Sequence, residues 1–413
     1  MKSWDTVAIP TLGRDVDVLP LYLTNSRSGL KELVPPKPSY RMYVCGITPY
    51  DATHLGHAAT YLTFDLINRY LRAQGSEVNY VQNITDIDDP LLERAQRDGI
   101  DWSDLAHSQI KLFTNDMVNL RVIPPAHYIG AVEAIPLVVK AVEDLDSQGS
   151  IYPIGNDYYF SNSVESGFGA LSHLSQLEME EIFAERGGDP TLAGKIHSLD
   201  CLVWMSQRQD EPGWPSSFGV GRPGWHIECT AIALEYLQPD SQEDYLIDIQ
   251  GGGSDLIFPH HEMCRSQARI LTGKELAANY VHAGMIGLDG EKMSKSKGNL
   301  VLVSTLVASG VDPMAIRYAL MSHHYRNNQM WSADVLERAQ FSLVRLRKAL
   351  AMNTVYESAD LMQMIISNLA DDLNTPAVIA AIEEWVERTL QGSAGGDATT
   401  VRTSLDALLG LKI

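Results

Sequence analysis

A strand, a helix and a second strand follow one another early in the chain. Residues 40–45 form a short apolar run, residues 58–73 carry apolar side chains at helical spacing, and residues 78–84 form another apolar run. Gly75 stands where a helix cap is expected. This order and spacing predict a parallel βαβ unit. Ligands of such sheets gather beyond the carboxyl ends of the strands, so we expect a site there.

Two histidines flank a glycine where the first strand gives way to the helix. His54-Leu55-Gly56-His57 places both imidazoles on one side of the first helical turn. The unpaired amides and positive dipole end of a helix N-terminus suit the phosphates of a nucleotide. Gly56 lets a flat ring approach the backbone. On its own, this tetrapeptide is more often a chance arrangement of surface or core residues.

A second short motif lies far along the chain. Lys292-Met-Ser-Lys295-Ser296 combines two cations with two hydroxyls, which suits a mobile clamp on departing pyrophosphate. A lone run of Lys and Ser is more often a solvated loop. Together, and separated by an α/β pattern, the two motifs resemble the paired signature of class I aminoacyl-tRNA synthetases. The resemblance implies ATP with Mg²⁺ as substrate, and catalytic roles for His54, His57, Lys292 and Lys295.

The cysteines form no CxxC pair, which argues against zinc-ribbon and thioredoxin motifs. Cys45 ends the first predicted strand, whereas Cys201, Cys229 and Cys264 lie far along the chain. Disulfides are rare in cytosolic proteins. Two thiolates with the imidazole of His260 would make a soft site suited to Zn²⁺. From spacing alone, small buried core cysteines are the commoner outcome.

Four segments shift that balance towards a metal site. They resemble the zinc-binding segments of cysteinyl-tRNA synthetases, and they are Tyr43-Val-Cys45-Gly, Trp225-His-Ile-Glu-Cys229, Gly251-Gly-Gly-Ser254-Asp255 and Pro259-His260-His261-Glu262. The resemblance implies one Zn²⁺ held by Cys45, Cys229 and His260, with a fourth position for the substrate thiolate. The family typically has glutamate at the position of Cys264. Cys264, one helical turn after His260, is then either a fourth protein ligand or a bystander close to the site; we favour the bystander, because four firm protein ligands would close the site. Cys201 is expected in the core.

The same resemblance implies which residues bind cysteine and its adenylate. They are Cys45, Gly46, Ile47, Thr48, Thr60, Asn83, Ile84, Thr85, Trp225, Gly253, Ser254, Asp255 and Ile286. Trp225 would wall the cysteine pocket. Serine would bind poorly, because a neutral hydroxyl is a weak ligand for Zn²⁺ held by sulfur. The expected first step is attack of the cysteine carboxylate on the ATP α-phosphate.

Two branches of this family differ in the acceptor of the activated cysteine. Cysteinyl-tRNA synthetases charge tRNA, whereas the paralogous ligases of mycothiol biosynthesis use the amine of glucosaminyl-inositol (GlcN-Ins). The hexapeptide Glu185-Arg186-Gly187-Gly188-Asp189-Pro190 resembles the signature of the ligases, although any loop can use a Gly-Asp-Pro turn. Residues 331–413 carry seven Lys and Arg against eleven Asp and Glu, which is a poor surface for an anticodon stem. We expect L-cysteine, ATP and GlcN-Ins as partners, with tRNA charging as the alternative.

The expected fold class is α/β, a class I synthetase Rossmann-like (HUP-type) parallel-sheet core with an inserted connective domain and a C-terminal helical bundle. The expected divisions are a leader (1–38), the first half of the core (39–121), the connective insertion (122–200), the second half of the core (201–300) and the helical region (301–413). A net charge of −20 disfavours nucleic acid. No apolar run or leader of membrane or secretory type is present in the sequence. We expect a cytoplasmic monomer. A non-catalytic module would have been expected to lose one of the two motifs.

Overall fold

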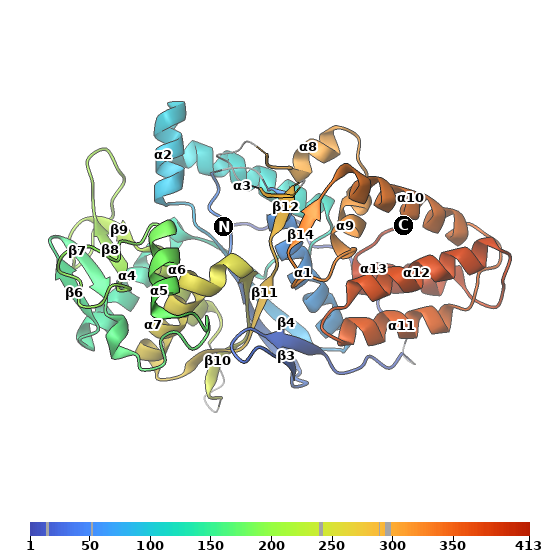
Figure 1. Cartoon of the computed structure of the whole chain (residues 1–413), viewed down its shortest axis with the longest axis horizontal. Coiled ribbons are helices and arrows are strands. Elements are labelled where there is room, and N and C mark those ends of the chain that lie inside the picture. Colours follow the sequence, from blue (N-terminus) through green and yellow to red (C-terminus); the bar gives the residue numbers. More distant parts are fainter. Residues whose placement is uncertain (14–15, 51–52, 239–242, 289, 294–298) are drawn as a thin grey trace.

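A parallel sheet lies at the centre of the molecule, with strand order β11-β10-β3-β4-β5 (Figure 1). The chain runs outward from β3 through β4 to β5, then returns to the other side of β3 as β10 and β11. The order therefore switches between β3 and β10, which is where open α/β sheets bind ligands. The strands are β3 (Ser39–Val44), β4 (Glu77–Ile84), β5 (His127–Gly130), β10 (Tyr245–Gly253) and β11 (Glu275–Ala283).

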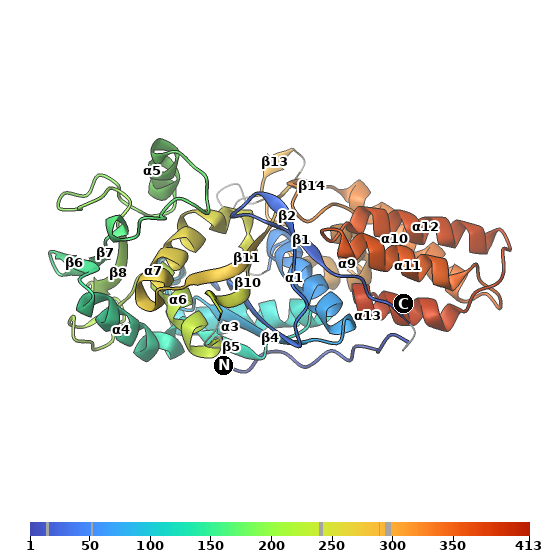
Figure 2. The ribbon, with the colours of Figure 1, turned by 90° about the horizontal axis from the view of Figure 1, so that it is seen from below.

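This computed structural model describes residues 1–13, 16–50, 53–238, 243–288, 290–293 and 299–413, with Glu291 and Lys292 as backbone alone. Within these residues, no helix has the length and apolar character that a membrane crossing needs. The molecule is elongated, with the α/β core between a smaller sheet-and-helix lobe and a helical bundle (Figures 1 and 2). The expected fold class is confirmed.

Helices cover both faces of the central sheet, which is why its strands read as continuous apolar runs. Successive side chains of a strand point to opposite faces, so Met42 and Val44 pack with α1. Tyr43 and Cys45 pack instead with α6 and α7. The register of β3 therefore aims Cys45 at these two helices. The covering helices are α1 (Leu55–Ala73), α3 (Trp102–Asn119), α4 (Ala131–Ser147), α6 (Trp225–Tyr236) and α7 (Glu262–Thr272).

The connective lobe has different boundaries from the expected 122–200. Strand β5 (127–130) pairs with β4 in the central sheet, so the first half of the core extends past residue 121. Strands β8 and β9 continue the antiparallel sheet β6-β7-β8-β9, so the lobe extends to Pro223. These pairings join segments far apart in sequence, which composition alone does not show. The remaining elements are α2 (Asp89–Asp98), β6 (Ile151–Ile154), β7 (Asp157–Phe160), α5 (Gln176–Glu185), β8 (Cys201–Ser206) and β9 (Gly221–Pro223).

The N-terminal leader, residues 1–38, contains a short hairpin. Strands β1 (Tyr22–Asn25) and β2 (Leu30–Leu33) form a hairpin, with Gly29 at a φ of 69° in its turn. The backbone amide of Thr24 donates to Asp372 at 2.8 Å. The hairpin thus ties the leader to the helical bundle. Strands of this length leave too short an alternation to stand out in a sequence.

A small sheet and a bundle of helices complete the chain. The motif loop begins in β13, and Lys295 lies outside the described residues. The sheet has the order β13-β12-β14. The elements are β12 (Ile286–Leu288), β13 (Glu291–Lys292), α8 (Val303–Ala308), α9 (Pro313–Met321), β14 (Gln329–Trp331), α10 (Ala333–Leu350), α11 (Ser358–Ala370), α12 (Thr375–Leu390) and α13 (Ala398–Leu409).

A buried charge cluster joins the core to this bundle. Asp65 and Arg69 of α1 and Arg317 of α9 have no exposed side-chain surface. Arg69 Nε donates to Asp65 at 2.7 Å, and Arg317 donates to the same carboxylate. The other guanidinium nitrogens donate to backbone carbonyls, including that of Leu409 at the end of α13. Burial alone would raise the pKa of Asp65, but the charges of the two arginines bring it below the usual value. We call these residues the Asp65 cluster.

Candidate active site

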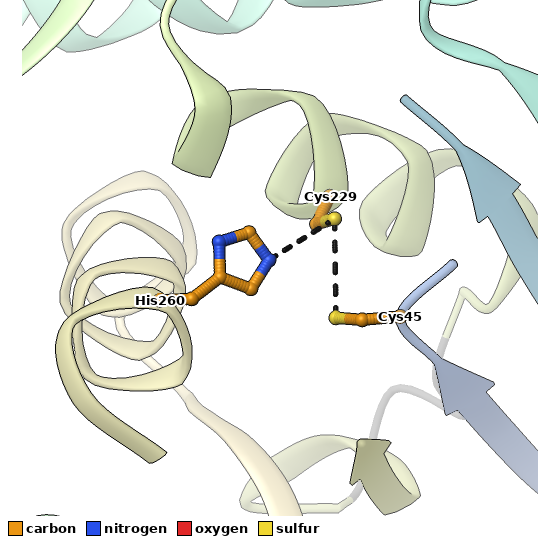
Figure 3. Close-up of side chains that lie close together, drawn as sticks. All are labelled: Cys45, Cys229 and His260. Carbon is orange, nitrogen blue, oxygen red and sulfur yellow. Dashed lines mark hydrogen bonds between the residues drawn. The ribbon is translucent and has the colours of Figure 1, made fainter. Parts of the chain in front are cut away.

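Two thiols and one imidazole converge beyond the carboxyl end of β3. Cys45 follows β3, Cys229 lies on α6, and His260 lies in the turn that leads into α7 (Figure 3). The sulfurs of Cys45 and Cys229 are 3.9 Å apart. His260 Nε2 is 3.3 Å from the Cys229 sulfur, and all three ligand atoms lie within 4.8 Å of one another. The structure brings together the three metal ligands that the sequence suggested.

The three side chains, the metal trio below, fit a zinc ion in both chemistry and spacing. Zinc bound tetrahedrally at about 2.3 Å from sulfur would separate two thiolates by roughly 3.8 Å. Burial raises the pKa of the Cys229 thiol, but the hydrogen bond from Cys45 and the charge of His260 outweigh it and lower this pKa well below its usual value. A thiolate is the form that binds metal. Two sulfurs and one nitrogen leave a fourth tetrahedral position for a substrate atom.

Further histidines orient the trio, and sequence reasoning did not assign them. His226 Nδ1 lies 3.0 Å from His260 Nδ1, which turns His260 Nε2 towards Cys229. His261 Nε2 lies 3.1 Å from the Cys45 sulfur, and its Nδ1 lies 2.7 Å from His282. Such partners fix the ring orientation of ligating histidines. His226 and His261 stand beside predicted ligands within the quoted segments, so adjacency was the available signal.

Cys264 lies beside the trio. Its sulfur is 3.8 Å from His260 Nε2 and donates to the carbonyl of His226 at 3.2 Å. It is absent from the compact group of candidate ligands among the described residues. Gln250 of β10 donates to the Cys45 sulfur at 3.4 Å. Cys201 is buried in β8, as expected for a core residue.

Close backbone packing shapes the loop after β3. The amide of Gly46 donates to Asn83 Oδ1 at 2.8 Å, and the amide of Thr85 donates to the carbonyl of Ile47 at 3.1 Å. A Cβ at residue 46 would lie 1.6 Å from the carbonyl oxygen of Asn83, so only glycine fits. These contacts hold Cys45, Thr48 and the end of β4, including Ile84, against one another.

The two motif histidines form a stacked pair at the start of α1. Their ring centroids are 3.8 Å apart, and His54 Nδ1 accepts from the amide of Gly56 at 3.1 Å. Burial lowers the pKa of His54 to about 4, with a small opposing effect of Asp255. Burial, with His54 as neighbour, lowers the pKa of His57 well below its usual value. Both rings are therefore neutral at pH 7, and His54 carries its proton on Nε2.

The expected nucleotide-side residues also lie along this edge. Gly253 ends β10, and the turn Ser254–Leu256 follows it. The hydroxyl of Thr60 donates to the carbonyl of Gly56 at 3.1 Å, on the first turns of α1. Ile286 is buried at the start of β12. The β3 loop and Gly253 therefore lie at the ends of β3 and β10, the two neighbouring strands between which the sheet order switches.

The glycine-rich hexapeptide follows α5 and reaches the same edge. Arg186 Nη1 donates to the carbonyl of Asp255 at 3.0 Å. Gly187 has a φ of 84°, and a Cβ at Gly188 would clash with Phe183, so the turn needs both glycines. The loop from Glu185 to Pro190 thus links the connective lobe to the second half of the core.

Two carboxyl groups near the trio stand out by their environment. Asp88 caps α2 by accepting from the amide of Asp89 at 2.8 Å. Burial raises the pKa of Asp88 to about 6. Glu228 is buried beside Cys229, with no hydrogen-bond partner for Oε2 among the described residues. Burial, followed by the charge of Asp88, raises the pKa of Glu228 well above its usual value.

Trp225 closes the site from the side of the connective lobe. It begins α6, and its ring stacks on that of His260 at a centroid distance of 4.5 Å. The indole is half-buried, so one surface of it faces open space. The role of Trp225 as a wall of the cysteine pocket stays a prediction.

Comparison with solved structures shows the fold. Methionyl-tRNA synthetase of Mycobacterium tuberculosis bound to methionyl-adenylate superposes with a TM-score of 0.67 at 16% identity, over 91% of this chain and 92% of that chain. A leucyl-tRNA synthetase of Agrobacterium radiobacter, solved as a ternary complex, gives a TM-score of 0.60 at 11% identity, over 92% and 84%. The chain shares the class I synthetase architecture.

Sequence comparison shows the family. Residues 34–341 match the family described as tRNA synthetases class I (C) catalytic domain. Proteins named L-cysteine:1D-myo-inositol 2-amino-2-deoxy-alpha-D-glucopyranoside ligase are similar over the full length of both chains, with 49% identity in Thermomonospora curvata, 50% in Nocardia farcinica and 51% in Kribbella flavida. The chain therefore belongs to the class I (C) tRNA synthetase family and, within it, to the group of these cysteine ligases.

Proposed function

We propose that this chain activates L-cysteine with ATP as cysteinyl-adenylate and transfers the cysteinyl group to the amine of GlcN-Ins, in mycothiol biosynthesis. The observation that carries the first half is the metal trio at the switch point of a class I synthetase sheet. Full-length similarity to proteins named as ligases of cysteine and this amino-sugar supports the acceptor. The products would be Cys-GlcN-Ins, AMP and diphosphate.

The metal trio would hold Zn²⁺, and a bound zinc would supply a Lewis-acid partner for the thiolate of cysteine. The chain itself orients the substrate around that position. Trp225 provides an apolar wall, and the β3 loop, fixed by Asn83, sets the place of Thr48 beside it. A serine hydroxyl stays protonated at neutral pH and offers a much weaker ligand, so selection of cysteine would need no editing.

The stacked histidines would bind the phosphates of ATP, with Mg²⁺ accompanying the nucleotide. Because both rings are neutral, they would act as hydrogen-bond donors rather than fixed cations. His54 can donate from Nε2, since its Nδ1 already accepts from Gly56. The positive end of α1 adds to the field at this point. Lys292 and Lys295 would neutralise the departing diphosphate.

The test is AMP release that depends on cysteine and ATP, with GlcN-Ins or tRNA(Cys) as the only acceptor. Replacing cysteine by serine is the control for the metal trio. We expect AMP with GlcN-Ins and cysteine, and background release with tRNA or with serine. Release of AMP and charged product with tRNA alone would contradict the proposed acceptor and leave the activation step standing.

A further inference from the structure

A cavity of about 770 Å³ opens between the connective lobe and the core, on the side of Trp225. This falls within the roughly 300–1,000 Å³ of small-molecule pockets. Its walls come from the β3 loop, the start of α2, strands β7 to β9, the 185–189 loop and the first residues of α6. Thr48 and Trp225 lie at its inner end, next to the metal trio.

The cavity is separate from the nucleotide side. Among the described residues, neither the stacked histidines nor Gly253, Ser254, Asp255 or Ile286 lines it. Arg186 stands between the two spaces, because it lines the cavity and donates to the carbonyl of Asp255. A molecule in this cavity would therefore approach the activated carboxyl from the side opposite ATP.

The lining has the chemistry of a site for a cationic sugar. Among the described residues it carries seven carboxylates against four cationic side chains, which opposes phosphate-bearing ligands. Tyr159, Phe183 and Trp225 add aromatic surface. Two of the cations are already engaged, since Arg222 pairs with Asp89 and Arg208 pairs with Asp157.

Asp88 is the carboxylate best placed for an amine. It lines the cavity together with Thr48, whose side chain hydrogen-bonds to it, and it accepts from the backbone amide of Asp89. No ion pair to Asp88 occurs in the described part of the chain, whereas its neighbour Asp89 is paired with Arg222. Its pKa of about 6 leaves it ionised at neutral pH, yet makes it a stronger base than an ordinary aspartate.

We infer that this cavity binds the amino-sugar acceptor and that Asp88 contacts its amine. The inference rests on the proposed function and adds where the acceptor binds and which residue acts as the base for its amine. The amine nitrogen attacks the carbonyl carbon of the adenylate, so a C–N bond forms. The bond from that carbon to the phosphate oxygen breaks, and AMP leaves with the electron pair. Asp88 takes the proton that the nitrogen loses. The hexapeptide loop then forms part of the acceptor wall.

The test separates the two half-reactions in the variant Asp88→Asn. Asparagine keeps the helix cap and volume and removes the charge. Exchange of diphosphate into ATP with cysteine alone should stay within twofold of the parent protein. Acceptor-dependent AMP release should lose about 10- to 100-fold in kcat/KM for GlcN-Ins, as expected when a hydrogen bond to a charged group is lost. Asp101→Asn, which changes the cap of α3 in the same way, should leave both reactions unchanged.

A second readout separates amine binding from a structural effect. Glucosyl-inositol carries a hydroxyl in place of the amine. In the parent protein its inhibition constant should exceed the dissociation constant of GlcN-Ins, and the ratio of these two constants should shrink in Asp88→Asn. Equal kcat/KM for GlcN-Ins in variant and parent would overturn the inference alone. A parallel loss of diphosphate exchange would also overturn the inference, because Asp88 would then act in the activation step. A parent that releases AMP with tRNA and not with GlcN-Ins would overturn the proposed function and this inference together.

Discussion

Two buried polar clusters, one centred on Asp65 of α1 and one formed by Cys45, Cys229 and His260, are built in opposite ways. In the Asp65 cluster, the carboxylate and both guanidinium groups are paired with one another or with backbone carbonyls. Beside the metal trio, Gln250 Oε1 and Glu228 Oε2 have no hydrogen-bond partner among the described residues, and neither has His57 Nδ1 of the stacked pair. Leaving such groups unpaired costs free energy. A completed cluster holds the fold, whereas an incomplete one is arranged for something that binds.

The largest effect should come from removing one charged partner of the Asp65 cluster. Arg317→Met leaves Asp65 with one cation and removes donors from Leu120 and Leu409. Breaking a buried charge pair from one side costs about 3–5 kcal/mol. We expect the urea midpoint, followed by tryptophan fluorescence, to fall sharply. An unchanged midpoint would mean that the cluster is not what joins bundle and core.

Removing one side chain of the metal trio should instead affect activity. In Cys229→Ala, metal content should fall from one ion per chain to near zero, and cysteine-dependent exchange should fall about a thousandfold, or about 4 kcal/mol, as expected for loss of a Lewis acid. Cys201→Ala is the matched control, because Cys201 is buried outside the trio. Metal retained at full occupancy in Cys229→Ala would refute the ligand assignment.

A smaller effect is expected at the stacked histidines. His54→Asn keeps an acceptor for the amide of Gly56 and so preserves the cap of α1. It removes the ring N–H that would reach a phosphate. Exchange should fall about a hundredfold, with thermal stability changed by less than about 1 kcal/mol. A large loss of stability with normal exchange per folded molecule would make His54 a structural residue.

The smallest effect concerns pH. Because Asp88 acts as a carboxylate, protonating it removes its advantage over asparagine. The ratio of acceptor kcat/KM between parent and Asp88→Asn should therefore narrow about tenfold per pH unit below about 6 and stay level above it. Burial is the main cause of the raised pKa of this carboxyl, and the charges of Asp89 and Arg222 act on it with smaller effects. Glu228 of α6 faces it as well, since the charge of Asp88 raises the pKa of Glu228. A ratio that is constant from pH 5 to 8 would exclude Asp88 as the base.

Much of the fold and of the candidate site could be predicted from the sequence, and the reasons for success and failure differ. The βαβ unit was predictable because apolar periodicity records which faces are buried. The metal trio was suggested by resemblance, since Cys45 and Cys229 alone looked like core residues. The structure adds the register of β3, which turns Cys45 rather than Val44 towards α6.

What the sequence could not provide depends on contacts between distant segments. The Asp65 cluster joins residues 252 positions apart, and the salt bridge between Arg222 and Asp89 spans 133. The cavity is formed by several separate stretches of chain, so no local pattern records it. The membership of β5 in the central sheet, and of β8 and β9 in the connective lobe, was missed for the same reason.

The metal trio also constrains how the protein can be made. Cys45 lies in the first half of the core, whereas Cys229 and His260 are encoded some two hundred residues later. On the ribosome, the first thiol therefore emerges long before its partners exist. An ion held by all three side chains could be captured only after the connective lobe has been synthesised and the second half of the sheet has closed against β3. Metal loading would thus be a late event that reports on completed assembly of the core.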